Sequence, residues 1–140
     1  MYKSIIVAID QSEQSDRAVT AAGELAKLSG GAVSVFHVRE HQDVIGKSGG
    51  SFDNEYQEEA DSLLKKATDA LAAEGVSASA SSAHVPIGHT AAEIVKAAAD
   101  AKADVIVVGS HGRTGLAAAF LGSTATKVLH LADRPVLVVR

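Results

Sequence analysis

Small residues follow one apolar segment of the chain at a spacing that could bind an anion. The segment, residues 105–108, is a run of four β-branched residues, which favours a strand buried on both faces of a parallel sheet. Glycine has no Cβ, so its backbone can approach another group closely, and a helix N-terminus adds free N–H groups. The pattern therefore predicts an anion site between a strand and a helix capped by Ser123. The small residues are Gly109, Gly112, Gly115, Gly122, Ser123 and Thr124.

The alternative to an anion site is a pair of ordinary turns. An isolated Gly-x-x-Gly after a buried strand is more often a turn than a binding loop, and Ser is a common helix cap. The second cluster, Gly122-Ser123-Thr124, is joined to the first by an apolar loop and favours the site. Arg113 lies in the loop, where it could contact a phosphate or be solvated.

Asp10 is a second candidate for chemistry, because it directly follows the apolar residues 5–9. A carboxylate at the end of a buried strand is unfavourable unless it meets a partner. Asp10 could bind the hydroxyls of a ribose, or it could cap the helix that follows. The residues themselves leave both interpretations open.

The elements that must position these residues alternate between strands and helices. Strands are expected over residues 5–9, 32–38, 76–85, 105–108 and 136–139. Helices are expected over residues 13–28, 55–74 and 123–132 and from Thr90, where Thr-Ala-Ala-Glu resembles a capping box. Leu28 is expected on the buried face of the first helix, and residues 39–54 as a long loop.

This alternation predicts an α/β fold with a five-stranded parallel sheet, doubly wound, with helices on both faces. Residues 1–140 are expected to form one domain. Ligands of such sheets bind beyond the carboxyl ends of the strands, where the strand order reverses. Asp10, residues 37–39 and the loop after Gly109 are expected to meet there.

Composition excludes several classes of protein. The net charge is −4 and Lys and Arg are scattered, so the sequence predicts no basic patch that would bind nucleic acid. There is no cysteine, so disulfides and thiolate chemistry are excluded, and this suits the cytoplasm. The apolar run at residues 5–9 is too short for a signal peptide or a membrane span. We therefore expect a cytoplasmic protein that does not bind a membrane.

Other known site signatures do not fit. Gly46-Lys47-Ser48 resembles the end of a P-loop, but His41 occupies the position of the first glycine. Asp10-Gln11-Ser12 stands where a dinucleotide fingerprint would begin. The six histidines show no metal-ligand spacing, and no Gly-x-Ser-x-Gly of a hydrolase occurs.

The chain resembles the universal stress protein family along its whole length. The spacing of Gly109, two residues, Gly112, nine residues and Gly122-Ser123 is similar to that of the ATP-binding branch of this family. The resemblance implies a fold of the adenine nucleotide alpha hydrolase type. The segments that carry the resemblance are residues 7–10, 36–38, 105–115, 121–124 and 134–139.

The resemblance also implies a role for each site residue. Asp10 and Gly109 would hold the ribose, Ala8 would line the base pocket, and the backbone of Val38 would bind the adenine edge. The family often has glycine after the first-strand aspartate, and Gln11 departs from this, which bears on affinity. The residues implied around the phosphates of ATP, with Mg²⁺ or Mn²⁺, are Gly112, Arg113, Gly115, Gly122, Ser123 and Thr124.

Finally, the resemblance implies an ATP-binding stress-response protein that signals as a homodimer. An apolar edge strand over residues 136–139 is a template for pairing, and family members commonly dimerise through it. No residue stands out as a general base for phosphoryl transfer, so at most slow ATP hydrolysis or autophosphorylation is expected. The alternative is a nucleotide-free interaction module with the same fold.

Overall fold

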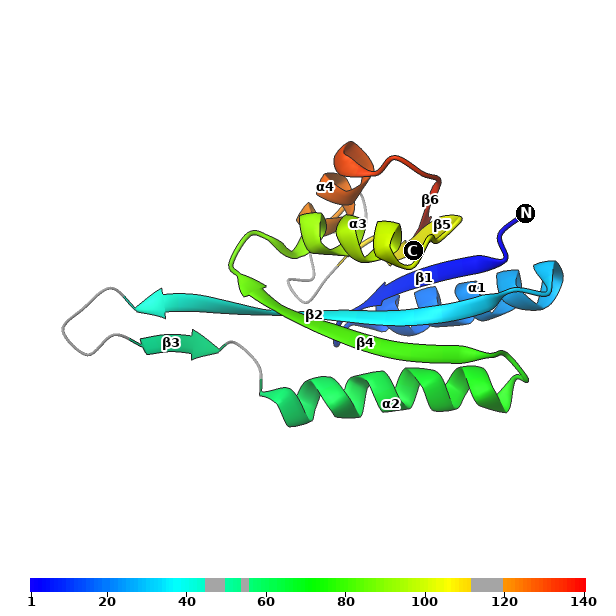
Figure 1. Cartoon of the computed structure of the whole chain (residues 1–140), viewed down its shortest axis with the longest axis horizontal. Helices are drawn as coiled ribbons and strands as arrows, with labels where there is room; N and C mark the ends of the chain where they lie inside the picture. The colour runs from blue at the N-terminus through cyan, green and yellow to red at the C-terminus, as the bar shows by residue number, and fades with distance from the viewer. Residues whose placement is uncertain (45–49, 54–55, 112–119) are drawn as a thin grey trace.

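The computed structural model describes residues 1–44, 50–53, 56–111 and 120–140 of the chain (Figure 1). Helices and strands alternate along most of this length, as the sequence predicts. In chain order they are β1 (Ser4–Ile9), α1 (Glu13–Ser29), β2 (Ala32–Val44), β3 (Gly50–Asp53), α2 (Gln57–Ala73), β4 (Ala78–Pro86), α3 (Thr90–Asp100), β5 (Val105–Gly109), α4 (Ser123–Leu131) and β6 (Val136–Val139).

The predicted parallel sheet is confirmed. Five strands pair in parallel in the order β4-β2-β1-β5-β6, with β1 in the centre. The chain winds outward from β1 in one direction to β2 and β4, and then crosses to β5 and β6 on the other side. The strand order therefore reverses between β1 and β5, and a ligand site is expected at their carboxyl ends.

Part of the region expected to be a loop is a β-hairpin instead. β2 continues as far as Val44, and its last residues pair antiparallel with β3. In Figure 1 this hairpin extends beyond the other strands of the sheet. A strand that leaves the layered core does not need alternating apolar residues, and this explains why the hairpin has no signal in the sequence.

Two apolar layers cover the two faces of the sheet. Successive side chains of a strand point to opposite faces, so Ile5 and Val7 of β1 belong to one layer and Ile6 to the other. Helices α1 and α2 cover the first face, and α3 and α4 cover the second. Within the described part of the chain, no helix is long and apolar enough to cross a membrane.

The prediction that Leu28 is buried is wrong. Its side chain is 87% exposed, whereas α1 buries a stripe of small residues that includes Ala18, Ala22 and Ala26. These alanines are four residues apart and share one face, but Leu28 lies six residues after Ala22, on another face of the helix. Small side chains on the packed face allow α1 to lie close to the sheet.

Candidate functional site

A cavity of about 310 Å³ opens at the carboxyl ends of β1 and β5, where the strand order reverses, and beside residues 36–40 of the longer strand β2. The first residues of α3 and α4 close its other side. It is lined by Ala8, Ile9, Asp10, Gln11, Ser15, Phe36, His37, Val38, Glu40, Thr90, Ile94, Val108, Gly109, Ser110, His111, Gly122, Ser123, Thr124 and Ala125.

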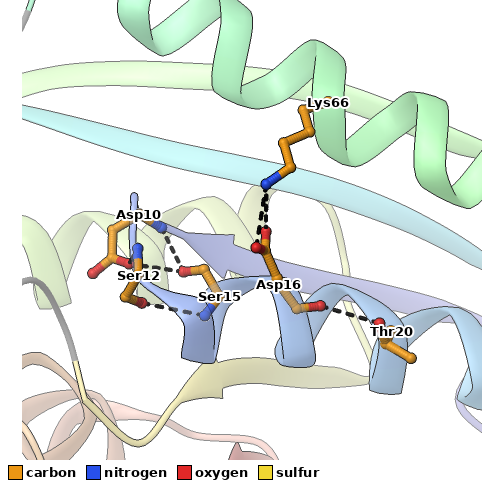
Figure 2. A network of polar contacts seen from close by, with 6 residues as sticks. All are labelled: Asp10, Ser12, Ser15, Asp16, Thr20 and Lys66. Carbon is orange, nitrogen blue, oxygen red and sulfur yellow. Dashed lines mark hydrogen bonds and ion pairs between the residues drawn. The ribbon is translucent and has the colours of Figure 1, made fainter.

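Asp10 organises the turn between β1 and α1 (Figure 2). Its Oδ1 accepts hydrogen bonds from the backbone N–H of Ser12 at 2.8 Å and from the Ser15 hydroxyl at 2.9 Å. Ser12 is the N-cap of α1, and its Oγ accepts from the backbone N–H of Ser15 at 3.2 Å. Asp10 therefore supports the helix cap through Ser12 and Ser15, while its Oδ2 takes no part in these bonds. The two interpretations of Asp10 are compatible, because each can use one oxygen.

The N-terminus of α4 presents backbone amides at the cavity. Gly122 is the N-cap, and its N–H already donates to the carbonyl of Ser110 at 2.6 Å. The first intrahelical bond runs from the N–H of Thr126 to the carbonyl of Gly122. The N–H groups of Ser123, Thr124 and Ala125 therefore have no partner inside the helix, and they carry the positive end of its dipole.

The prediction that Ser123 caps α4 is wrong. Ser123 is the first helical residue, and Gly122 before it has extended backbone angles with φ at −62°. No side chain in the described ranges caps α4 with a hydrogen bond. Thr90 likewise begins α3 instead of capping it, because the N-cap is His89. Within the described residues, both helices therefore begin beside the cavity without a capping hydrogen bond from a side chain.

The wall of the cavity formed by β2 and α3 is mainly apolar. Phe36, Val38 and Glu40 alternate along β2 and share one face of the strand, and Ile94 of α3 faces the same cavity. Glu40 is fixed by its Oε2, which accepts a hydrogen bond from the backbone N–H of Gly88 at 2.8 Å. This wall could hold the flat ring of a ligand, with Glu40 at its polar end.

His37 of β2 fixes the end of β1 at the cavity, which it also lines. It is only 4% exposed, and its Nδ1 lies 2.7 Å from the carbonyl oxygen of Ile9. A carbonyl can only accept, so Nδ1 carries the proton. The bond fixes the carbonyl of the residue directly before Asp10.

A second polar link lies at the end of β5. Ser110 is buried, its Oγ is 2.9 Å from Nδ1 of His111, and its N–H donates to the carbonyl of Val139 in β6. With the bond from Gly122 to its carbonyl, Ser110 holds together the ends of β5, β6 and α4. Ser110 and His111 are part of the glycine motif, but sequence reasoning gave them no role.

The structure brings together the predicted site residues that it describes, with one exception: Arg39 does not line the cavity and donates to Oε1 of Gln57 on α2 at 2.7 Å. Ala8, Asp10, Val38, Gly109, Gly122, Ser123 and Thr124 all line the cavity, and Gln11 joins them. Gly112, Arg113 and Gly115 lie outside the described residues. Sequence reasoning missed four lining residues, Phe36, Glu40, Thr90 and Ile94. For two of them a signal exists: Phe36 and Glu40 alternate with Val38 along the strand, so all three must share one face.

Comparison with known proteins agrees with this architecture. The model of the universal stress protein family matches residues 1–140 of the chain. The chain belongs to the universal stress protein family. The universal stress protein YxiE of Bacillus subtilis is 34% identical over 151 residues, covering 100% of both chains.

Solved structures of universal stress proteins share the fold. The MJ0577 protein of Methanocaldococcus jannaschii superposes with a TM-score of 0.80 at 27% identity, covering 99% of this chain and 96% of that one. A universal stress protein of Archaeoglobus fulgidus, solved in complex with dAMP, gives a TM-score of 0.71 at 27% identity and covers 99% and 98%. At least one structural neighbour therefore binds an adenine nucleotide.

Proposed function

We propose that this universal stress protein binds ATP with Mg²⁺ or Mn²⁺ in the cavity and acts as a nucleotide-dependent regulatory dimer in the cytoplasm. The observation that carries the proposal is the position of the α4 N-terminus. Ser123, Thr124 and Ala125, whose amides have no partner inside the helix, line the same 310 Å³ cavity as Asp10 and the apolar wall of β2 and α3. The dAMP complex of the Archaeoglobus relative supports an adenine nucleotide as the ligand and a place in the ATP-binding branch.

Each part of ATP has a matching surface. The adenine ring would lie against Ala8, Val38 and Ile94, with the backbone of Val38 at its edge. The ribose hydroxyls would donate to the second oxygen of Asp10. The phosphates would lie over the amides of Ser123 and Thr124, because a helix N-terminus favours negative charge.

A divalent cation is expected to be part of the bound complex. Asp10 and Glu40 line the cavity, and among its described lining residues there is no Lys or Arg. The free amides of α4 supply only about half an elementary charge. Mg²⁺ or Mn²⁺ on the phosphates would supply the remaining positive charge, with Arg113 as a further candidate outside the described residues.

Binding is tested by thermal unfolding of the purified protein with Mg-ATP. A binder at a hundredfold excess of ligand over its dissociation constant gains about 2.7 kcal/mol of stability. Gly122→Val should abolish this gain but preserve the fold, because a φ of −62° suits valine and the added side chain lies at the cavity. No gain in the unmodified protein would favour the alternative, a nucleotide-free interaction module.

We further propose that ATP is turned over slowly or not at all. Fast phosphoryl transfer needs a base or a water-positioning residue beside the terminal phosphate, and no residue of the sequence stands out for that role. Turnover of isotopically labelled ATP should stay below about one per second, the low end for kinases. A faster rate would make the protein an enzyme rather than a nucleotide-dependent regulator.

The proposed dimer forms through β6. This strand lies at the end of the sheet order, and Leu137 is 40% exposed. The carbonyls of Pro135 and Val139 face β5, so alternation directs the N–H of Val138 to the free edge. Val138→Pro removes this donor and should halve the mass measured by light scattering. A monomeric unmodified protein would contradict the proposal.

A further inference from the structure

We propose that Glu40 and Thr90 form a polar subsite that binds the amino-bearing edge of the base and selects a 6-amino purine over a 6-oxo purine. The inference rests on the proposed function and goes beyond it, because it gives the cavity a side-chain basis for choosing among nucleotides.

Glu40 is held in one position at the cavity. It follows Val38 by two residues on β2, so both side chains lie on the face that lines the cavity. Its Oε2 accepts from the N–H of Gly88 at 2.8 Å, and Gly88 has a φ of +89°, which glycine adopts without strain. One oxygen thus anchors the carboxylate to the turn before α3, and the other can accept a hydrogen bond from a ligand.

Thr90 supplies an independent sign of a missing partner. Its Oγ1 is buried and has no hydrogen-bond partner in the described part of the chain. Thr90 lines the same cavity, two residues after the glycine that anchors Glu40. A buried hydroxyl without a partner is unfavourable, so a ligand that supplies one gains affinity. A ring nitrogen of a base is a suitable acceptor for this hydroxyl.

The two ends of the cavity differ in charge, and this gives the ligand its direction. The N-terminal amides of α4 lie at the end of β5, whereas Glu40 lies on β2, three residues past the position that pairs with the end of β1. β1 separates these strands, so the two ends are about 10 Å apart from strand spacing alone. A carboxylate repels phosphate, so the anionic end of a nucleotide must lie at α4 and its base at Glu40.

A carboxylate at the base edge distinguishes donors from acceptors. The 6-amino group of adenine donates a hydrogen bond, whereas the 6-oxo group of hypoxanthine presents an acceptor that the carboxylate repels. Hydrogen bonds to a charged group are stronger than neutral ones, so losing this bond should weaken binding at least about tenfold.

The test compares ATP and ITP, each with Mg²⁺, by isothermal titration calorimetry. The unmodified protein should bind ATP at least about tenfold more tightly than ITP. In Glu40→Gln the amide oxygen can still accept from Gly88, but the amide nitrogen donates. The variant should therefore lose affinity for ATP, gain affinity for ITP and lose most of the discrimination. Glu24→Gln is the matched control. Glu24 is exposed on α1, so this variant should keep the discrimination between ATP and ITP.

The outcomes separate this inference from the proposed function. Equal affinity for ATP and ITP in the unmodified protein, or unchanged discrimination in Glu40→Gln, overturns the subsite but leaves ATP binding intact. Binding of neither nucleotide overturns the proposed function itself. Thr90→Val is a second variant with little change in shape, and it should weaken ATP several-fold. An unchanged affinity of Thr90→Val for ATP would show that Thr90 is not part of the subsite.

Discussion

Gln14 of α1 lies so close to Gly109 of β5 that a side chain at position 109 would collide with it. A Cβ added to Gly109 would come 2.9 Å from the Cβ of Gln14 and 3.1 Å from its carbonyl carbon. The first turn of α1 therefore packs directly on the backbone at the end of β5, beside the cavity. One glycine of the glycine-rich motif is thus required by the packing of the fold, whatever the ligand.

Gly109→Ala should consequently destabilise the protein even without nucleotide. The added methyl group meets helix backbone, which cannot move as easily as a side chain, so the cost should be about 1–3 kcal/mol. Urea unfolding of the ligand-free protein measures it. Gly75→Ala provides a comparison, since a Cβ there meets no atom within 4 Å, although its φ of +74° adds some strain. Unchanged stability of Gly109→Ala would mean that α1 shifts away freely.

Asp10→Ala should reduce both stability and the response to Mg-ATP. The substitution removes two hydrogen bonds to a charged acceptor at the start of α1, which we expect to cost about 1.5–3 kcal/mol. Asp16→Ala is the matched control, since the side chain of this exposed aspartate forms a surface ion pair with Lys66 at 3.2 Å (Figure 2). Thermal unfolding with and without Mg-ATP measures both effects. A full response in Asp10→Ala would exclude Asp10 from the proposed ribose site.

Thr90→Val should make the ligand-free protein more stable. The substitution removes a buried hydroxyl without a described partner and keeps the branched shape, so we expect a gain of about 1 kcal/mol. Thr126→Val is the opposite case, because the Oγ1 of Thr126 donates to the carbonyl of Gly122 at 2.9 Å and its loss should destabilise. Denaturant unfolding measures the free energy of unfolding of both variants, which should rise in Thr90→Val and fall in Thr126→Val. Destabilisation by Thr90→Val would mean that its hydroxyl has a partner.

The Lys27–Glu74 pair should contribute to stability at neutral pH but not in strong acid. Nζ of Lys27 lies 2.7 Å from Oε2 of Glu74. The hydrogen bond and the positive charge of Lys27 lower the pKa of Glu74 below the ordinary value of 4.5. A pKa lowered on folding stabilises the protein above the unfolded value, and this contribution is lost as pH falls through the folded value.

NMR titration of the Glu74 carboxyl group measures this effect. Lys27→Met should return its pKa toward 4.5, with only a small loss of stability because both side chains are exposed. An unchanged pKa in the variant would show that the pair does not persist in solution.

Much of the fold follows from local patterns in the sequence. The β-branched run at residues 105–108 and the apolar periods of the helices predict the parallel strands and the helices because both depend on spacing along the chain. The same patterns identify the carboxyl end of β1, and therefore Asp10, as part of the site. The errors occur where the deciding contact lies far away in sequence. Leu28 is exposed because distant strands select the alanine face of α1, and the β2–β3 hairpin depends on main-chain pairing with no apolar alternation.

The site shows the same division between local and distant information. Sequence spacing by itself determined that glycines, Asp10 and a helix start would meet at the end of a sheet, because strand order and right-handed crossovers leave few alternatives. Only the tertiary structure decided that Gly122 rather than Ser123 is the N-cap, that Gly109 is needed by Gln14, and that Glu40 and Thr90 reach the cavity. Each of these depends on which atoms of separate elements come within a few ångströms, and a one-dimensional pattern carries no such distances.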